Sequence, residues 1–171
     1  MKRAYYSDTI IAFLRREPDA IHGRLNNHAE GPVEQDQKEA WAEQIRILKS
    51  VLADCQGKVY FEYAIPRMGK RIDVVLVIAG VVFVLEFKVN ATGYDAYAFD
   101  QVWDYALDLK NFHETSHHCT VAPILIATEA DYSQTVPATT PQNDNLLEPI
   151  QCNRTGLKEA IDSVLLFADT E

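Results

Sequence analysis

Cysteine and long apolar runs are both scarce in this chain. Three cysteines, Cys55, Cys119 and Cys152, occur among 171 residues, and none belongs to a CxxC pair. An odd, dispersed set argues against a disulfide framework, a four-cysteine zinc site or an iron-sulfur cluster. No uninterrupted stretch reaches the roughly 18 apolar residues of a membrane span, and MKRAYYSDTI at the N-terminus lacks the apolar core of a signal peptide. We therefore expect a cytoplasmic protein without a membrane segment.

Basic charge is also in deficit. The chain has 16 Lys and Arg against 25 Asp and Glu, a formal net charge of −9, whereas nucleic-acid-binding domains normally carry a basic footprint. A metal-dependent phosphodiesterase remains compatible with this balance, because its own acids take part in the chemistry. The length and a hydrophobic content of 47% fit one domain with a sizeable core. We expect a single domain over residues 1–171, with a helical extension over about 1–32.

Hydrophobic spacing predicts a mixture of helices and strands. Helices are expected at about 7–16, 18–27, 33–53, 95–112 and 156–168, and strands at 60–65 and 122–127. Three prolines between residues 131 and 153 predict a long irregular loop. The segment 71–90, RIDVVLVIAGVVFVLEFKVN, is typical of two strands covered on both faces, with the turn of a hairpin at Ala79-Gly80.

Three charged residues, Asp73, Glu86 and Lys88, interrupt the strands of this hairpin. If the turn is tight, Ile78 pairs with Val81, Asp73 lies opposite Glu86, and Lys88 shares their face. Two carboxylates about 5 Å apart repel by roughly 3 kcal/mol at an effective dielectric near 20, which raises one pKa by about two units. A Glu86–Lys88 ion pair is the structural explanation, but buried pairs seldom improve stability. We favour a divalent metal held by the two carboxylates, with Lys88 beside it.

The order helix, strand, hairpin, helix, strand, helix, with Asp73 and Glu86-Phe87-Lys88 across the hairpin, resembles the PD-(D/E)xK, or restriction-endonuclease-like, nuclease superfamily. The resemblance implies an α/β (α+β) fold with a mixed sheet, in which helices flank the central hairpin. Gln101 and Tyr105 on the following helix fit the QxxxY motif of the RecB-like branch, although two polar residues one turn apart are common by themselves.

A narrower resemblance covers residues 1 to about 130. RAYYSDTI, WAEQIRILK, IPRMGKRIDVVLVI, VFVLEFKV and QVWDYALDLKNFH are similar to the nuclease-like domain at the N-terminus of certain bacterial nuclease-helicase proteins. RecB-like relatives often have a histidine in the site, and many carry an iron-sulfur cluster, neither of which this chain shows clearly. The sequence leaves open whether the chain is a fragment or a stand-alone version.

The resemblance also implies a role for each motif residue. Asp73 and Glu86 would bind Mg²⁺ or Mn²⁺ together with the main-chain carbonyl of Phe87, since hard cations choose oxygen ligands. Lys88 would orient or help to deprotonate the attacking water and offset charge on the phosphate. Gln101 and Tyr105 would connect the site to the nucleic-acid backbone.

Further acids, bases and metal ligands are candidates with simpler explanations. Members of the superfamily often place an acid on the helix before the sheet, where Glu43, or Glu39 one turn earlier, is the candidate, although a solvated helix face explains either. The residues that we expect either to contact phosphate or to form a solvated turn are Arg67, Lys70 and Arg71. The residues that fit either a zinc site or, as we favour, a helix end and polar loop are His113, His117, His118 and Cys119.

The implied function is a Mg²⁺-dependent nuclease that hydrolyses DNA phosphodiester bonds in repair, processing or defence against foreign DNA. Its partners would be DNA and a helicase domain in the same or a partner polypeptide, which could hold the DNA for an acidic nuclease domain. Two alternatives stay open: a catalytically inactive module that binds DNA or a partner protein, and a nuclease that acts on RNA. The oligomeric state is open as well.

Overall fold

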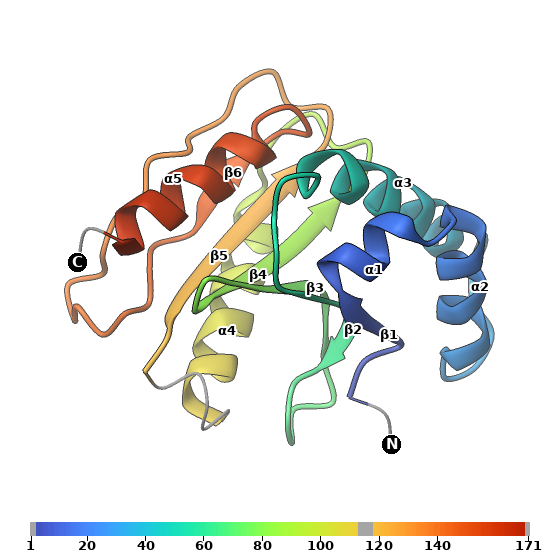
Figure 1. Ribbon diagram of the computed structural model, residues 1–171. Helices are drawn as coiled ribbons and strands as arrows, with labels where there is room; N and C mark the ends of the chain where they lie inside the picture. The colour runs from blue at the N-terminus through green and yellow to red at the C-terminus, as the bar shows by residue number, and fades with distance from the viewer. Residues whose placement is uncertain (1–2, 113–117, 170–171) are drawn as a thin grey trace.

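The computed structural model describes residues 3–112 and 118–169, which form a six-stranded mixed sheet with helices on both faces (Figure 1). The strands are β1 (Tyr6–Thr9), β2 (Lys58–Ala64), β3 (Arg71–Ile78), β4 (Val81–Lys88), β5 (Thr120–Ala127) and β6 (Ile150–Cys152). They lie side by side in chain order, antiparallel from β1 to β4 and parallel from β4 to β6. The mixed α/β sheet predicted from the sequence is therefore confirmed.

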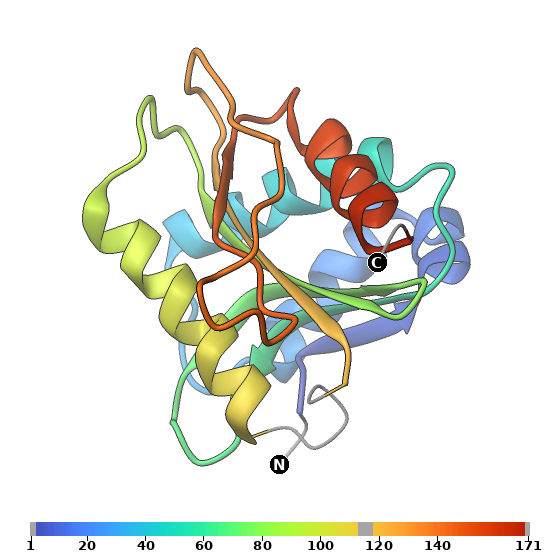
Figure 2. The same cartoon turned by 90° about the vertical axis from the view of Figure 1, so that its left-hand side faces the viewer.

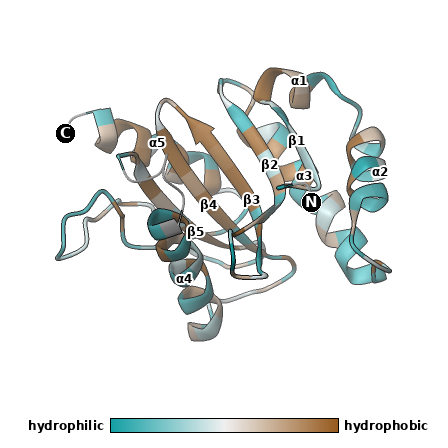
Figure 3. Cartoon of the chain, turned by 90° about the horizontal axis from the view of Figure 1, so that it is seen from below, coloured by the Kyte–Doolittle hydropathy of each residue, from teal (hydrophilic) through white to brown (hydrophobic). Residues whose placement is uncertain are grey.

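Helices cover the two faces unequally. They are α1 (Ile10–Arg15), α2 (Pro18–His28), α3 (Gln35–Val51), α4 (Ala96–Phe112) and α5 (Leu157–Asp169). One face packs against α1, α2, α3 and α5, and the other against α4, as the turned view shows (Figure 2). The β4 and β5 ribbons are largely hydrophobic, apart from Glu86 and Lys88 near the end of β4, because side chains on both of their faces are buried (Figure 3).

Local signals explain where two of the helices begin. The Thr9 hydroxyl accepts a hydrogen bond from the Ala12 amide at 3.1 Å, so Thr9 caps α1. The Asp95 carboxylate accepts one from the Ala98 amide at 2.9 Å at the start of α4. The helix, strand, hairpin, helix, strand, helix order predicted for the core is the order of α3, β2, β3–β4, α4, β5 and α5.

The prediction was wrong in two segments. The extension over 1–32 is not wholly helical, because residues 6–9 form the edge strand β1, whose Tyr6 ring packs 5.9 Å from that of Phe61. The expected loop over 131–153 contains the short strand β6, with Ile150 and Cys152 buried beside β5. Strands of three or four residues are too short for alternation to reveal them. Among the described residues, no helix combines the length and apolar character of a membrane span.

Two glycines provide a paired test of the fold. Gly57 precedes β2 at a φ of +146°, and a Cβ there would collide with the carbonyl of Val77, whereas Gly23 within α2 has open space around it. We expect Gly57→Ala to lower the free energy of unfolding by more than about 1 kcal/mol, and Gly23→Ala to raise it by about 0.5–1 kcal/mol. Urea denaturation of both variants measures the difference, and equal effects would contradict the packing described for β2 and β3.

Candidate active site

The register of the central hairpin determines which residues of β3 and β4 lie opposite one another at the site. The β3–β4 pairs run from Ile78–Val81 to Val74–Leu85, and the turn residues Ala79 and Gly80 both have positive φ, of 50° and 80°. Positive φ at both central residues is the signature of the two-residue hairpin turn expected from the sequence. One further step along the same register places Asp73 opposite Glu86, as predicted.

The two strands separate at this step. The β3–β4 ladder ends at Val74–Leu85, and the Asp73 carboxylate instead accepts a hydrogen bond from the Phe87 amide at 2.9 Å. On its other side β4 stays paired with β5 as far as Lys88. The amide and carbonyl of one strand residue point to the same side, so the Phe87 carbonyl is expected to face the fork between β3 and β4. This is the carbonyl that the resemblance implies as a metal ligand.

Glu86 is the most deeply buried acid of the site. Its side chain is 7% exposed, no N–H or hydroxyl donor of the described residues reaches its Oε2, and its carboxyl is within hydrogen-bonding reach of the Asp73 carboxyl. The other oxygen, Oε1, lies 3.5 Å from the Lys88 ammonium, which donates to the Gln101 Oε1 at 3.1 Å. Gln101 in turn donates from Nε2 to the Tyr105 hydroxyl at 2.8 Å. The structure thus joins four of the sequence-predicted residues in one chain of polar contacts.

Both hairpin carboxyls resist ionisation in this setting. Burial raises the pKa of Glu86, and the charge of Asp73 raises it further, against the attraction of Lys88. Burial also raises the pKa of Asp73, against the Phe87 hydrogen bond and Lys88. For Tyr105, burial raises the pKa, with Gln101 opposing and the charges of Glu86 and Asp73 adding to the rise. One ammonium therefore does not compensate two buried acids.

Glu62 is an acid of this site that the sequence analysis missed. The β2–β3 pairs Phe61–Val74 and Tyr63–Ile72 flank it, so it lies opposite Asp73. Its Oε1 accepts hydrogen bonds from the Trp41 indole at 3.0 Å and the Gln37 amide at 3.4 Å, both on α3. Glu62, Asp73 and Glu86 thus form an acidic row across β2, β3 and β4. Counting from the sequence could not have found it as it found Glu86, because residues 65–70 between β2 and β3 form a longer connection that does not fix the register.

The acidic row coincides with an exchange of strand faces. Phe61 and Val74 contribute to the core under α3, but Tyr63 and Ile72, two residues further along, contribute to the core under α4. Regular alternation would keep residues two apart on one strand, such as Phe61 and Tyr63, on the same face. Glu62 has a φ of +53°, which is uncommon outside glycine and marks the break in the strand.

Glu43 is held in a separate ion-pair cluster. It pairs with Arg46 and, at 2.5 Å, with Arg154, which also lies 2.5 Å from Glu129. Glu129 and Arg154 follow β5 and β6, so the cluster lies at the sheet end where β4 reaches Lys88. The described contacts do not join Glu43 to Asp73 or Glu86. Its alternative, Glu39, is exposed and accepts a hydrogen bond from Gln35 at 3.2 Å.

The three predicted phosphate-binding residues differ in how many contacts their side chains already make within the protein. Arg71 donates to the Glu62 carbonyl at 2.7 Å, pairs with Glu30 at 3.2 Å and stacks 4.2 Å from the Tyr5 ring centre. Its guanidinium is therefore held beside the main chain of Glu62 by these contacts, and a phosphate contact of Arg71 stays a prediction. Arg67 and Lys70 are exposed in the turn between β2 and β3.

The alternative zinc site lies partly outside the described residues. His113 and His117 of the expected alternative lie outside the described residues, whereas His118 and Cys119 lie within them. Over residues 3–112 and 118–169, no group of three or more His, Cys, Asp or Glu side chains is placed to hold a metal ion. A metal at the hairpin would therefore depend on two carboxylates, backbone oxygen and water, which suits Mg²⁺ better than a structural zinc ion.

A repair endonuclease from Pyrococcus abyssi is similar to this chain in structure. The two have a TM-score of 0.42 and 22% sequence identity, and the match covers 74% of this chain and 49% of that one. The chain therefore spans about half the length of that protein. No protein-family model matches the chain, and no curated protein matches its sequence. What the site can do follows from its own residues and distances.

Glu62 gives the metal-free protein a predicted pH dependence. Burial, with the nearby charge of Asp73, raises its pKa from 4.5 to about 7, although Trp41 and Arg71 oppose the rise. Between pH 4.5 and about 7, Glu62 is ionised in the unfolded chain but still neutral in the folded protein. The free energy of unfolding therefore falls as pH rises through this range, by up to about 3 kcal/mol. Glu62→Gln keeps an acceptor for Trp41 and should raise the free energy of unfolding at pH 8 but not at pH 4.

Urea denaturation in EDTA at pH 4, 6 and 8 measures this effect. Glu39→Gln is the matched control, because it makes the same change at an exposed position of α3. A stability difference between wild type and Glu62→Gln that stays constant across the three pH values would show that the Glu62 carboxyl is not held in its neutral form.

Proposed function

We propose that this chain is a nuclease that hydrolyses phosphodiester bonds of DNA with the aid of Mg²⁺ or Mn²⁺. The observation that carries the proposal is the pair of carboxyls of Asp73 and Glu86, which lie together at the fork of β3 and β4, where no N–H or hydroxyl donor of the described residues reaches Glu86 Oε2. Two carboxyls in contact at a buried site must share a proton or bind a cation. Functional sites are where such groups concentrate.

The donor set fits a hard divalent cation. Asp73 and Glu86 offer carboxylate oxygens, and the Phe87 carbonyl is expected on the same side of β4. Magnesium binds through one or two carboxylates and keeps several waters, so it does not need a third side chain. A doubly charged ion would also provide the positive charge that the raised pKa values of Asp73 and Glu86 show to be lacking.

The remaining residues have roles that follow from their contacts. When bound, the metal would act as a Lewis acid on the phosphate. The Lys88 ammonium, held between Glu86 and Gln101, can orient a water molecule and stabilise negative charge that develops on the phosphate. Gln101, fixed by Lys88 and Tyr105, limits the positions that the ammonium can adopt. Gln101 and Tyr105 are further proposed to contact the nucleic-acid backbone.

DNA as the substrate, and a helicase domain in the same or a partner polypeptide, enter the proposal through the family resemblance of the motif residues. The RecB-like branch is proposed for the same reason, with the Lys88–Gln101–Tyr105 contacts as its support. Glu43 is retained only as a second-choice acid at the same sheet end, because its ion pairs with Arg46 and Arg154 compete with any catalytic use.

Removal of the Lys88 ammonium should abolish most cleavage. We expect Lys88→Ala to lower the rate by about 10²–10³-fold, the usual effect of losing one group that stabilises transition-state charge. End-labelled single- and double-stranded DNA and RNA, incubated with Mg²⁺, Mn²⁺ or EDTA, provide the measurement. Lys158→Ala is the control, since that lysine is exposed on α5. Equal cutting by wild type and Lys88→Ala, or cutting in EDTA, would refute the proposal.

Metal binding can be measured without turnover. Titration calorimetry with Mn²⁺ should show one site in wild type, and Asp73→Asn or Glu86→Gln should weaken it by more than the about 10–100-fold typical of outer-shell changes. Because both carboxyls have raised pKa values, binding should release protons and strengthen from pH 6 to pH 8. Glu159→Gln, an exposed change on α5, should bind as wild type does. Unaltered Mn²⁺ binding in Glu86→Gln would show that the metal binds at a site that does not include Glu86.

A further inference from the structure

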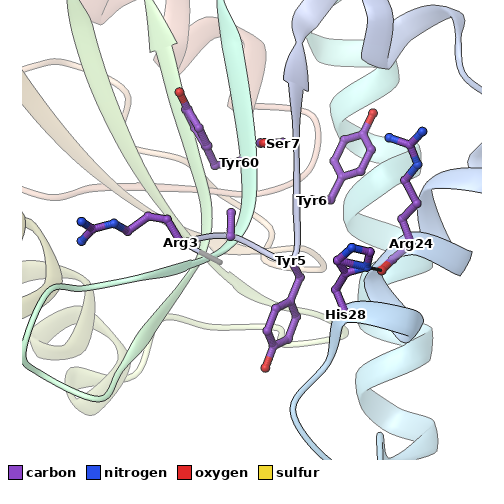
Figure 4. Close-up of a pocket in the computed structure, with 8 residues that line it drawn as sticks. Arg3, Tyr5, Tyr6, Ser7, Arg24, His28 and Tyr60 are labelled. Carbon is purple, nitrogen blue, oxygen red and sulfur yellow. Dashed lines mark hydrogen bonds between the residues drawn. The ribbon is translucent and has the colours of Figure 1, made fainter. Parts of the chain in front are cut away.

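A basic and aromatic hollow lies at the free edge of the sheet. It has a volume of about 410 Å³ and is hereafter called the β1 pocket. The residues that line it are Arg3, Ala4, Tyr5, Tyr6, Ser7, Arg24, His28 and Tyr60 (Figure 4). The lining contains two arginines, a histidine and three tyrosines but no acid, although acids outnumber bases in the chain by 25 to 16. The pocket is therefore locally basic in a protein whose net charge is negative.

The two arginines of the β1 pocket are free to bind an anion. Both are exposed, and within the described part of the chain neither makes an ion pair with an acid. Arg24 lies over the Tyr6 ring at 5.9 Å. In the close-up, Arg3 and Arg24 extend from opposite sides of β1, with Tyr60, Ser7 and Tyr6 between them (Figure 4). Guanidinium groups on both sides of the edge strand can contact phosphates of a strand that passes over this edge of the sheet.

Tyr60 supplies an aromatic surface in the same hollow. It lies opposite Ser7 in the β1–β2 ladder, is half-buried, and meets Tyr63 in a T-shaped contact of 5.7 Å. Tyr60 also packs against the core under α4, so this wall lies on the face of the sheet to which Lys88 and Gln101 belong. An aromatic ring beside unpaired arginines is the combination that binds single-stranded nucleic acid, because an unstacked base can lie on the ring.

The β1 pocket is aligned with the acidic row. The Tyr6–Phe61 pair and the bond from the Ala64 amide to the Arg3 carbonyl, 2.7 Å, place Tyr5 opposite Glu62. Tyr5 thus lies two strands from Asp73, or about 10 Å at the usual strand spacing. Arg71, against Tyr5 at 4.2 Å and bonded to the Glu62 carbonyl, connects the two regions. A strand whose scissile phosphate lay at the hairpin could therefore reach the β1 pocket within a few nucleotides.

We propose that the β1 pocket binds a single-stranded segment of the nucleic-acid substrate, with Arg3 and Arg24 on phosphates and Tyr60 on a base. The inference rests on the proposed function, because it names the substrate class of the same site. With these two unpaired arginines, an acidic domain would hold a polyanion through a local cluster of cations instead of a basic surface. A peptide that adds a strand to the free edge of β1 is the competing occupant, since edge strands are templates for pairing.

Binding measured without cleavage tests the pocket. Fluorescence anisotropy in EDTA, with a labelled single-stranded DNA 12-mer, should show at least tenfold weaker binding for Arg3→Ala/Arg24→Ala than for wild type. The slope of log affinity against log salt should fall by about 1.4 when two phosphate contacts are lost. Arg15→Ala, which removes an exposed arginine of α1 outside the pocket, should bind as wild type does. Blunt duplex DNA should bind more weakly than the single strand in wild type.

Variants of Tyr60 separate stacking from packing. Tyr60→Phe keeps the ring and should bind the single strand as wild type does. Tyr60→Ala should bind it at least three times more weakly than Tyr60→Phe does. Thermal unfolding of each variant shows whether it is folded, and Tyr60→Phe remains informative if Tyr60→Ala unfolds. Unchanged single-strand affinity in the double arginine variant, or equal loss in Arg15→Ala, would overturn the proposal and leave the strand-adding peptide as the occupant.

The two proposals fail in distinguishable ways. If Lys88→Ala abolishes cleavage while the arginine variants bind and cut as wild type does, the nuclease proposal stands and the β1 pocket proposal is overturned. If the arginine variants lose single-strand binding but no metal supports cleavage by wild type, the pocket proposal stands and the nuclease proposal fails. A single-stranded RNA 12-mer run in parallel decides which sugar the pocket prefers.

Discussion

The burial of Glu86 beside Asp73 is the constraint on which the rest of the site depends. Over residues 3–112 and 118–169, Lys88 is the one ammonium that pairs with either of these two carboxyls, and it is shared with Gln101. The pairing of Glu86 with Leu125 of β5, together with the Leu85–Val74 pair just before it, holds the β4 backbone at Glu86 in place. The arrangement is unfavourable for an apo protein and favourable for one that binds a divalent cation, because the cation reverses the balance of charge.

The sequence was sufficient for the hairpin and for the helix behind it. A tight turn and a strict two-residue period fix which side chains face one another, so Asp73 and Glu86 could be paired by counting. The QxxxY spacing similarly placed Gln101 and Tyr105 one turn apart, where they are bonded. These are local relations, and local geometry is what a sequence pattern encodes most directly.

The remaining features depend on contacts between distant segments. Nothing in the sequence around Glu62 marks it as part of the site, because its place beside Asp73 depends on the register of β2 against β3 and on Trp41 from α3. The contacts of Arg71 with Glu30 and Tyr5, which precede it by more than 40 residues, likewise depend on the fold. The β1 edge strand was not predicted from the sequence, because four residues show too little alternation. The pocket that β1 lines was therefore not predicted either.

The fork between β3 and β4 has a consequence for observing the site. Where a neighbouring backbone carbonyl would normally accept the Phe87 amide, a titratable carboxylate does so, at 2.9 Å. The chemical shift and solvent exchange of that one amide proton therefore depend on the charge of Asp73. Nuclear magnetic resonance could follow protonation of Asp73, and the metal and substrate binding that we propose, through a backbone signal, without any label or substitution in the site.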